Sequence, residues 1–176
     1  MRIITGKYKG RHFDIPRTFK ARPTTDFAKE NLFNVVRAYL DFEGAHALDL
    51  FGGTGSITFE LLSRGCERVV CIEKDSQHFR FIHTCLDSLK DSHAELLRGD
   101  AFRFLSRCHE QFDFIFADPP YALPDLEKIP ELVLNTEILA PEGLFVLEHG
   151  KTNDFSNNPR CVEHRVYGSV NFSFFQ

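Results

Sequence analysis

Tryptophan is absent from this sequence of 176 residues, and no C-x-x-C pair occurs among its five cysteines. An odd number of cysteines without such a pair argues against a disulfide framework and against a zinc knuckle. The eight histidines show no H-E-x-x-H or comparable spacing, so we predict no metal site. No apolar run approaches the roughly 18–20 residues that span a bilayer, and the N-terminal residues lack the apolar core of a signal peptide. We therefore expect a cytoplasmic protein that does not contact membranes.

Acidic residues are scarce at the N-terminal end of the chain, although the whole sequence carries a net charge of −4. Residues 1–37 contain nine lysines and arginines against three acids, which makes a net charge of +6 and leaves −10 for the rest. A basic segment joined to an acidic body suggests that one end of the protein contacts a polyanion. The alternative is a solvated basic arm without a partner.

The start of the basic segment is predicted to form a small β-hairpin. Residues 2–5 and 10–13 have the composition of short strands, and residues 6–9 (GKYK) between them supply a turn. We accordingly divide the chain into residues 1–23, a basic hairpin and loop, and residues 24–176, one larger domain.

The larger domain alternates helical and strand patterns. A first helix is expected from a cap at Thr24 or Thr25 to about Leu40. From residue 46 onward, strands and helices follow one another in the β-α rhythm of a parallel sheet that is covered on both faces. Residues 161–167 and 169–175 alternate with period two and have no helix between them, which predicts an antiparallel hairpin at the edge of the sheet. The other expected strands are 47–50, 68–73, 94–98, 112–117 and 143–148, and the expected helices are 56–62, 76–89, 101–108 and 125–139, the last interrupted at Pro130.

A glycine-rich turn follows the first strand of the alternating region, at residues 49–55 (DLFGGTG). Ligands of open α/β sheets bind beyond the carboxyl ends of the strands, and Glu73, at the end of the next strand, is suited to accept both hydroxyls of a ribose. Thr58 stands where the dinucleotide fingerprint would need a glycine, and Asp49 would repel a pyrophosphate. A carboxylate at that position suits S-adenosylmethionine, which carries an ammonium and a sulfonium. The alternative is a tight strand-to-helix turn that binds no ligand.

The sequence Asp118-Pro119-Pro120-Tyr121 follows the apolar strand predicted at residues 112–117. Neither proline donates an N–H, and each holds the preceding residue extended, so the Asp118 carboxylate and the Pro119 carbonyl become two neighbouring acceptors. Two fixed acceptors suit an exocyclic amine of a nucleic-acid base, because they orient its nitrogen and stabilise the charge that develops during methyl transfer. Tyr121 is placed to stack on that base, which must be flipped out or unpaired. The alternative is a proline strand terminator with a surface aspartate.

Together these motifs resemble the class I amino-methyltransferases of nucleic acids, through residues 118–121 and 49–55. The N-terminal part is similar to the RsmD family, most specifically at residues 22–26 (RPTTD), and also at residues 2–4 and 30–34. The resemblance covers essentially the whole chain. It implies an enzyme that uses S-adenosylmethionine to methylate N2 of a guanine in 16S ribosomal RNA, either in naked RNA or in an assembling small subunit. It also implies a Rossmann-like α/β fold with a seven-stranded, mostly parallel sheet.

The resemblance also assigns roles to residues of the basic segment. Thr24 and Thr25 would close over the methionine end of the cofactor, and the basic hairpin would contact RNA.

Asp100 is a candidate acceptor for the exocyclic amine of the cofactor's adenine beside the Ala101 N–H, and it would also cap the helix that follows. The predicted cofactor-binding residues are Thr24, Thr25, Asp49, Phe51, Gly52, Gly53, Thr54, Gly55, Glu73, Lys74, Asp100 and Ala101, and the predicted RNA-binding residues are Arg2, Lys7, Lys9, Arg11 and Arg22.

Two other functions remain open at this point. An adenine-N6 methyltransferase of DNA or RNA would use the same Asp-Pro-Pro-Tyr sequence, although 176 residues leave little room for the recognition region that a DNA enzyme usually needs. An RNA-binding ribosome-assembly factor on an inactive methyltransferase scaffold is the alternative of another class. The intact residues 118–121 and Glu73 argue against this second alternative.

Overall fold

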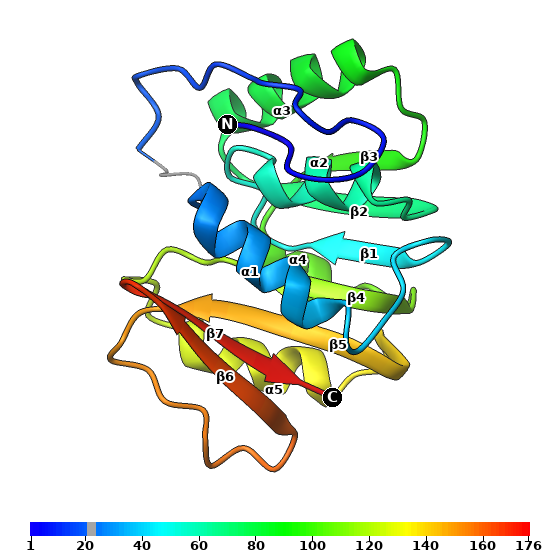
Figure 1. The fold of residues 1–176 in the computed structure, drawn as a ribbon. Coiled ribbons are helices and arrows are strands. Elements are labelled where there is room, and N and C mark those ends of the chain that lie inside the picture. The colour runs from blue at the N-terminus through cyan, green and yellow to red at the C-terminus, as the bar shows by residue number, and fades with distance from the viewer. Residues whose placement is uncertain (21–23) are drawn as a thin grey trace.

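The computed structural model describes residues 1–20 and 24–176, so Arg22 and Pro23 of the predicted basic block lie outside the described residues. At its centre is a seven-stranded sheet with the strand order β3-β2-β1-β4-β5-β7-β6 (Figure 1). Strands β1 to β5 run parallel, and β7 is antiparallel to both β5 and β6. This topology confirms the predicted Rossmann-like sheet with its antiparallel C-terminal hairpin. The strands are β1 His46–Asp49, β2 Arg68–Glu73, β3 Ala94–Arg98, β4 Phe112–Ala117, β5 Leu139–His149, β6 Cys161–Tyr167 and β7 Val170–Phe175.

Helices cover both faces of the sheet. Helices α1, α2 and α3 lie on one face, where α1 and α2 pack against Phe114 and Phe116 of β4, whereas α4 and α5 pack on the other face against Ile115 and Ala117. Successive side chains of a strand point to opposite faces, which explains why a strand buried on both faces is almost entirely apolar. No helix in the described parts of the chain is long and apolar enough to cross a membrane. The described helices are α1 Asp26–Val36, α2 Ser56–Ser63, α3 Ser76–Leu89, α4 Ala101–Leu105 and α5 Ile129–Leu134, preceded by the 3-10 turn η1 Leu126–Lys128.

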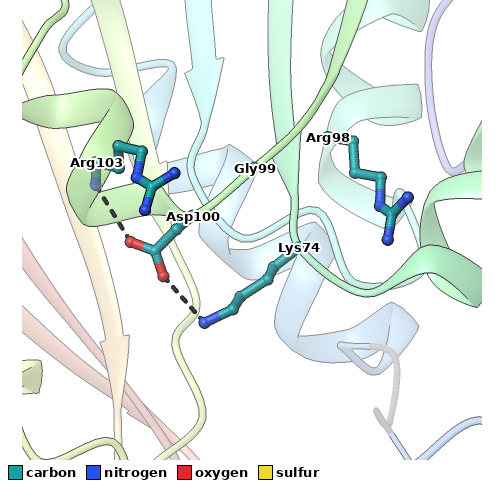
Figure 2. Close-up of a pocket in the computed structure, with 5 residues that line it drawn as sticks. All are labelled: Lys74, Arg98, Gly99, Asp100 and Arg103. Atoms are coloured by element: carbon teal, nitrogen blue, oxygen red, sulfur yellow. Dashed lines mark hydrogen bonds and ion pairs between the residues drawn. The ribbon is translucent and has the colours of Figure 1, made fainter.

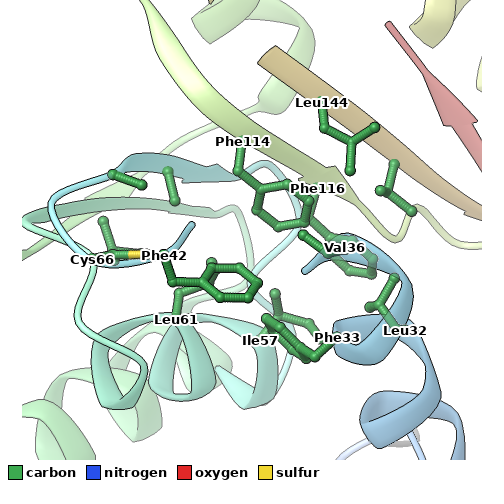
Figure 3. Packing of buried hydrophobic residues seen from close by; sticks show 14 of the residues in the cluster. Leu32, Phe33, Val36, Phe42, Ile57, Leu61, Cys66, Phe114, Phe116 and Leu144 are labelled. Carbon is green, nitrogen blue, oxygen red and sulfur yellow. The ribbon is translucent and has the colours of Figure 1, made fainter. Parts of the chain in front are cut away.

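Phenylalanine side chains fill much of the core between α1, α2 and the sheet. Figure 3 shows Phe33 of α1 and Phe42 together with Phe114 of β4. The ring centroids of Phe33 and Phe42 are 5.4 Å apart, and those of Phe42 and Phe114 are 6.4 Å apart in an edge-to-face arrangement. Such aromatic pairs add about 0.5–1.5 kcal/mol each beyond the burial of their area. They hold α1 against β4, and so help to hold its N-terminus at the edge where the parallel strands end.

Several predicted boundaries are confirmed, namely those of β2, α3, β3, β4 and β6. The first helix was predicted too long: α1 ends at Val36, and residues 37–40 form tighter turns from which Tyr39 donates to Glu163 at 2.7 Å. The predicted interruption at Pro130 takes the form of a change of helix type, because the 3-10 turn η1 ends at Lys128 and α5 begins at Ile129. Pro130 lies in the first turn of α5, where its missing N–H costs no intrahelical hydrogen bond.

Two other helices were also predicted too long. Helix α4 ends at Leu105 instead of Cys108. The helix that was expected to end at Leu139 ends at Leu134. The segment after it joins the sheet, because Leu139 already pairs with Phe112 before an irregularity shifts the register of the two strands. Strand β5 is therefore longer than the run that begins at Gly143 suggests.

The N-terminal segment forms an antiparallel hairpin with a single bridge, Arg2 to His12, where two short strands were predicted. Its backbone is attached to a helix. The buried carboxylate of Glu60 in α2 accepts the backbone N–H groups of Ile4 at 2.9 Å and Thr5 at 3.0 Å. This side chain takes the place of a neighbouring strand, which explains why the pairing stops after one bridge.

Candidate active site

Acidic residues stand at the carboxyl ends of four parallel strands. Asp49 ends β1, Glu73 ends β2, Asp118 directly follows β4, and Glu148 is the penultimate residue of β5. Because these strands run parallel to one another, their carboxyl ends meet at one edge of the sheet. This is the left edge in Figure 1, where α1 begins and the β6–β7 turn also lies. Ligands of such sheets bind at this edge.

The glycine-rich turn between β1 and α2 depends on backbone conformations that favour glycine. Gly53 and Gly55 have φ angles of 57° and 80°, in the left-handed region. A Cβ on Gly55 would lie 2.6 Å from the Phe59 ring, and one on Gly52 would lie 2.6 Å from the sulfur of Cys71. Glycine at these two positions therefore lets the turn pack closely against side chains of α2 and β2.

Glu73 holds this turn in place through hydrogen bonds to the backbone. Its Oε2 accepts the N–H of Gly53 and its Oε1 accepts the N–H of Asp75, both at 2.7 Å. The side chain is buried, but an ionised carboxylate has about four acceptor positions, so two remain for other donors.

Asp49 is buried beneath the same turn. Its Oδ2 accepts the hydroxyl of Thr58 at 2.7 Å, whereas its Oδ1 has no hydrogen-bond partner among the residues that the structure describes. Burial raises the pKa of Asp49 to about 6, although the hydrogen bond from Thr58 acts in the opposite direction. Thr58, considered in the sequence only as the place of a missing glycine, therefore holds the aspartate.

A hollow of about 640 Å³ lies beside the ends of β2 and β3 (Figure 2). Asp100 accepts the backbone N–H of Arg103 at 3.2 Å, which confirms that it caps α4, and it also accepts a hydrogen bond from Lys74 at 3.2 Å. Arg98, Gly99 and Arg103 line the hollow together with these two residues. Arg98 and Arg103 were not among the predicted site residues, because arginine spacing alone carries no signal for a pocket.

The two threonines directly precede α1, and this helix begins at the same edge of the sheet as the turn. The hydroxyl of Thr25 accepts the N–H of Ala28 at 3.2 Å, which confirms that Thr25 is the N-cap of the predicted helix. Thr24 is half-buried beside it.

Asp118 is half-buried and is followed by buried Pro119 and exposed Pro120. Burial raises the pKa of Asp118 well above its ordinary value, and the neighbouring carboxyl groups of Glu148 and Asp49 raise it further. The described residues give Asp118 no ion pair that would offset this effect.

Tyr121, the last residue of this motif, has a side chain that is 46% exposed. Its hydroxyl donates to Oε1 of Glu148 at 3.0 Å, and its ring is so close to Gly150 that a Cβ there would lie 3.2 Å from it. The Tyr121 ring is thus held through its hydroxyl and lies beside Gly150, and it is partly exposed to solvent.

Comparison with known proteins identifies the family of this chain. A family model described as "Conserved hypothetical protein 95" matches residues 1–176. The chain belongs to this family. Ribosomal RNA small subunit methyltransferase D of Haemophilus influenzae is 31% identical over 100% of this chain and 93% of its own length. The Escherichia coli K12 protein of the same name is 30% identical over 100% and 89%.

A solved structure of yhhF from Escherichia coli, assigned as a methyltransferase, has a TM-score of 0.87 at 30% identity and covers 100% of this chain and 97% of its own. The structure of a hypothetical protein from Thermus thermophilus also has a TM-score of 0.87, at 28% identity over 100% and 99%. The fold of this family member is therefore that of the class I methyltransferases.

Sequence reasoning about this family member missed Glu148. The residue is buried, with its Oε1 bonded to Tyr121, and Oε2 has no partner among the described residues. Burial raises the pKa of Glu148 to about 7, although the Tyr121 hydroxyl acts against this rise. The signal is present in the sequence, because Glu148 is an acid near the end of a predicted strand, as Glu73 is.

The basic hairpin of this family member lies mostly away from the candidate active site. Lys7 pairs with Asp91 beyond the end of α3 at 2.9 Å, and Arg11 donates to the Ser88 carbonyl near that end at 3.3 Å. Helix α3 starts at the carboxyl edge and its 14 residues run back roughly 21 Å, so these groups lie toward the opposite edge of the sheet. Arg2 lies near the start of α1, where it pairs with Asp26 at 3.1 Å.

Proposed function

We propose that this protein transfers a methyl group from S-adenosylmethionine to the exocyclic N2 amine of a guanine in 16S ribosomal RNA. The observation that carries the proposal is Asp118, a half-buried carboxylate without a cationic partner among the described residues, followed by two prolines at the edge of the sheet. The relatives named ribosomal RNA small subunit methyltransferase D support the choice of ribosomal RNA. Methylation of ribosomal RNA would take place in the cytoplasm.

The residues around the glycine-rich turn fit this cofactor. Asp49 offers an ammonium group a buried oxygen that has no partner among the described residues. Gly52, Gly53 and Gly55 allow the tight turn beside it. We assign the ribose hydroxyls to Glu73 and the methionine end also to Thr24 and Thr25. We assign the adenine to the hollow beside Asp100. Phe51, Thr54, Lys74 and Ala101 complete the proposed cofactor site.

The work of the catalytic motif is to hold the amine in position. An exocyclic amine has two N–H donors and a lone pair that is delocalised into the ring, so it is a poor nucleophile. The Asp118 carboxylate and the Pro119 carbonyl accept these donors, favour a pyramidal nitrogen and stabilise its developing positive charge. The bound cofactor supplies an electrophilic methyl group, and water suffices to remove the proton afterwards.

Tyr121 and Pro120 complete the proposed catalytic motif. The exposed face of the Tyr121 ring is available to stack on a base, which contributes roughly 1–3 kcal/mol in comparable complexes. The base must leave its helix or be unpaired in order to reach Asp118. Pro120 stiffens the chain between the two side chains because its φ angle is restricted.

The proposed RNA contacts of the basic hairpin make a prediction that separates neighbouring lysines. Lys9→Ala should reduce the slope of log Kd for RNA against the logarithm of the salt concentration by roughly 0.7. This is the value for one lost phosphate contact on single-stranded RNA. Lys7→Ala should reduce it less, because Lys7 is already paired with Asp91. Fluorescence anisotropy between 50 and about 300 mM salt measures both slopes.

Lys128→Ala is the matched control for the two hairpin variants. Lys128 pairs with Asp125 beside α5, which packs on the face opposite to α1, α2 and α3, and its slope should not change. Equal slopes for the Lys9 variant and the parent protein would remove the hairpin from the proposed RNA surface. RNA would then have to bind to a different surface than the one proposed at Arg2, Arg11 and Arg22.

The proposed reaction is tested by mapping modified nucleotides of ribosomal RNA from cells with and without the gene. We expect one N2-methylguanosine to disappear from 16S RNA and to return when the purified protein and S-adenosylmethionine are added. Loss of an N6-methyladenosine would instead support the adenine enzyme. An unchanged set of modifications, with impaired subunit assembly, would support the inactive assembly factor.

A further inference from the structure

Glu148 has an arrangement that the proposed methyl transfer does not itself require. The side chain is 5% exposed, and one of its two carboxyl oxygens has no hydrogen-bond partner among the described residues. Its other oxygen accepts the Tyr121 hydroxyl at 3.0 Å. A buried acceptor without a partner costs free energy, so such a group in a folded protein calls for an explanation.

The pairing of β4 and β5 sets Glu148 beside Asp118. Ala117 is in register with Leu147, so the next positions along these parallel strands, Asp118 and Glu148, are neighbours and project to the same face. Adjacent strands lie about 4.8 Å apart. Burial raises the pKa of Asp118, and the charge of Glu148 raises it further, as expected for neighbouring carboxyl groups.

Two carboxyl groups side by side match the edge of guanine. Guanine has two kinds of donor next to one another on that edge, the N1–H and the N2 amine. Adenine has an amine beside N1, but its N1 carries a lone pair and no hydrogen. A second carboxylate beside the first would therefore accept a hydrogen bond from guanine, whereas it would face a second acceptor in adenine.

Tyr121 brings a stacked base to the same carboxyl group. Its hydroxyl, at the edge of the ring, points to Oε1 of Glu148. A base that stacks in parallel on the ring would point its own edge in the same direction, one stacking distance away. A donor on that edge would then face the side of the Glu148 carboxyl group, where Oε2 is the free acceptor.

We propose that Oε2 of Glu148 accepts the N1–H of the target guanine while Asp118 holds its N2 amine, so that Glu148 selects guanine over adenine. This proposal rests on the proposed function and names the part of the base that the site recognises. Donation from N1–H favours the ionised carboxylate, so the base stabilises a charge that is costly in its absence.

The experiment replaces the target guanosine in a synthetic RNA with 2-aminopurine riboside, which keeps the amine at position 2 but has no N1–H. The parent protein should prefer guanosine by roughly 5- to 150-fold in kcat/KM, the range for one good base contact. In Glu148→Gln, the amide is able to turn its N–H toward N1 of 2-aminopurine, so most of this preference should be lost.

Tyr121→Phe is the matched control, because it removes the hydroxyl bonded to Glu148 but leaves both carboxyl oxygens in place. It should lower activity yet retain the preference for guanosine. An equal preference in the parent protein and in Glu148→Gln would overturn the role of Glu148, as would a parent protein that uses both bases equally well. If the parent protein methylates no guanosine at all, the proposed function fails instead.

Discussion

Replacing Asp118 with alanine is expected to lower kcat for methyl transfer by about 10²- to 10³-fold, the effect of removing one preorganised group that stabilises the transition state. The Kd for S-adenosylhomocysteine should change little, because Asp49, Glu73 and the glycine-rich turn hold the cofactor in our proposal. Single-turnover transfer of a labelled methyl group to 16S RNA measures the first quantity, and calorimetry measures the second.

The matched variant Asp118→Asn keeps the shape of the side chain and one acceptor oxygen, so its loss should be smaller than that of Asp118→Ala. Full activity in the alanine variant would contradict the mechanism. A large rise in the Kd for S-adenosylhomocysteine would instead show that Asp118 belongs to the cofactor site.

The stability of the Asp118→Ala protein has a predictable dependence on pH. The folded protein raises the pKa of Asp118, and it raises the pKa of Glu148 from 4.5 to about 7. The folded state therefore binds more protons than the unfolded state between about pH 4.5 and 7, and without ligands the parent protein loses stability as the pH rises through this window. The alanine variant lacks one of these carboxyl groups, so its melting temperature should fall less over the same window.

Replacing Lys29 with methionine is expected to lower the free energy of unfolding by about 3–5 kcal/mol, the usual cost of leaving a buried charge without its partner. Lys29 is 1% exposed, and its ammonium lies 3.6 Å from Oε2 of Glu60, which is fully buried. The same ammonium donates to the Arg2 carbonyl at 2.6 Å and to the Ser56 hydroxyl at 3.1 Å. Urea denaturation measures the loss.

The double variant with Glu60→Gln tests the cause of this loss. Removing both charges should cost less than the sum of the two single changes, because the Glu60 charge that Lys29 helps to balance is then absent. Lys151→Met, at an exposed position, is the control and should change stability by less than about 0.5 kcal/mol. A loss below about 1 kcal/mol for Lys29→Met would mean that Arg64, which also pairs with Glu60, is sufficient to balance its charge.

Much of the fold was predictable because its strands are short, apolar and regularly spaced. The bounds of β2, β3 and β4 follow from their composition, and α3 from its pattern and its cap. The errors fall where local patterns compete with pairing to distant residues. Leu139 has the pattern of a helix end but pairs with Phe112, and the N-terminal hairpin bonds to Glu60 instead of extending into strands.

The sequence by itself determined the order of the elements, the glycine-rich turn and the Asp-Pro-Pro-Tyr motif, because each depends on the conformations of consecutive residues. Only the tertiary structure decided which acids share one edge, since the register of β4 and β5 sets Asp118 beside Glu148 across a gap of thirty positions. It also decided that Lys29 is buried, and that Lys7 is paired with Asp91. Burial and charge pairing depend on residues that are distant in the chain, so neither can be read from a local pattern.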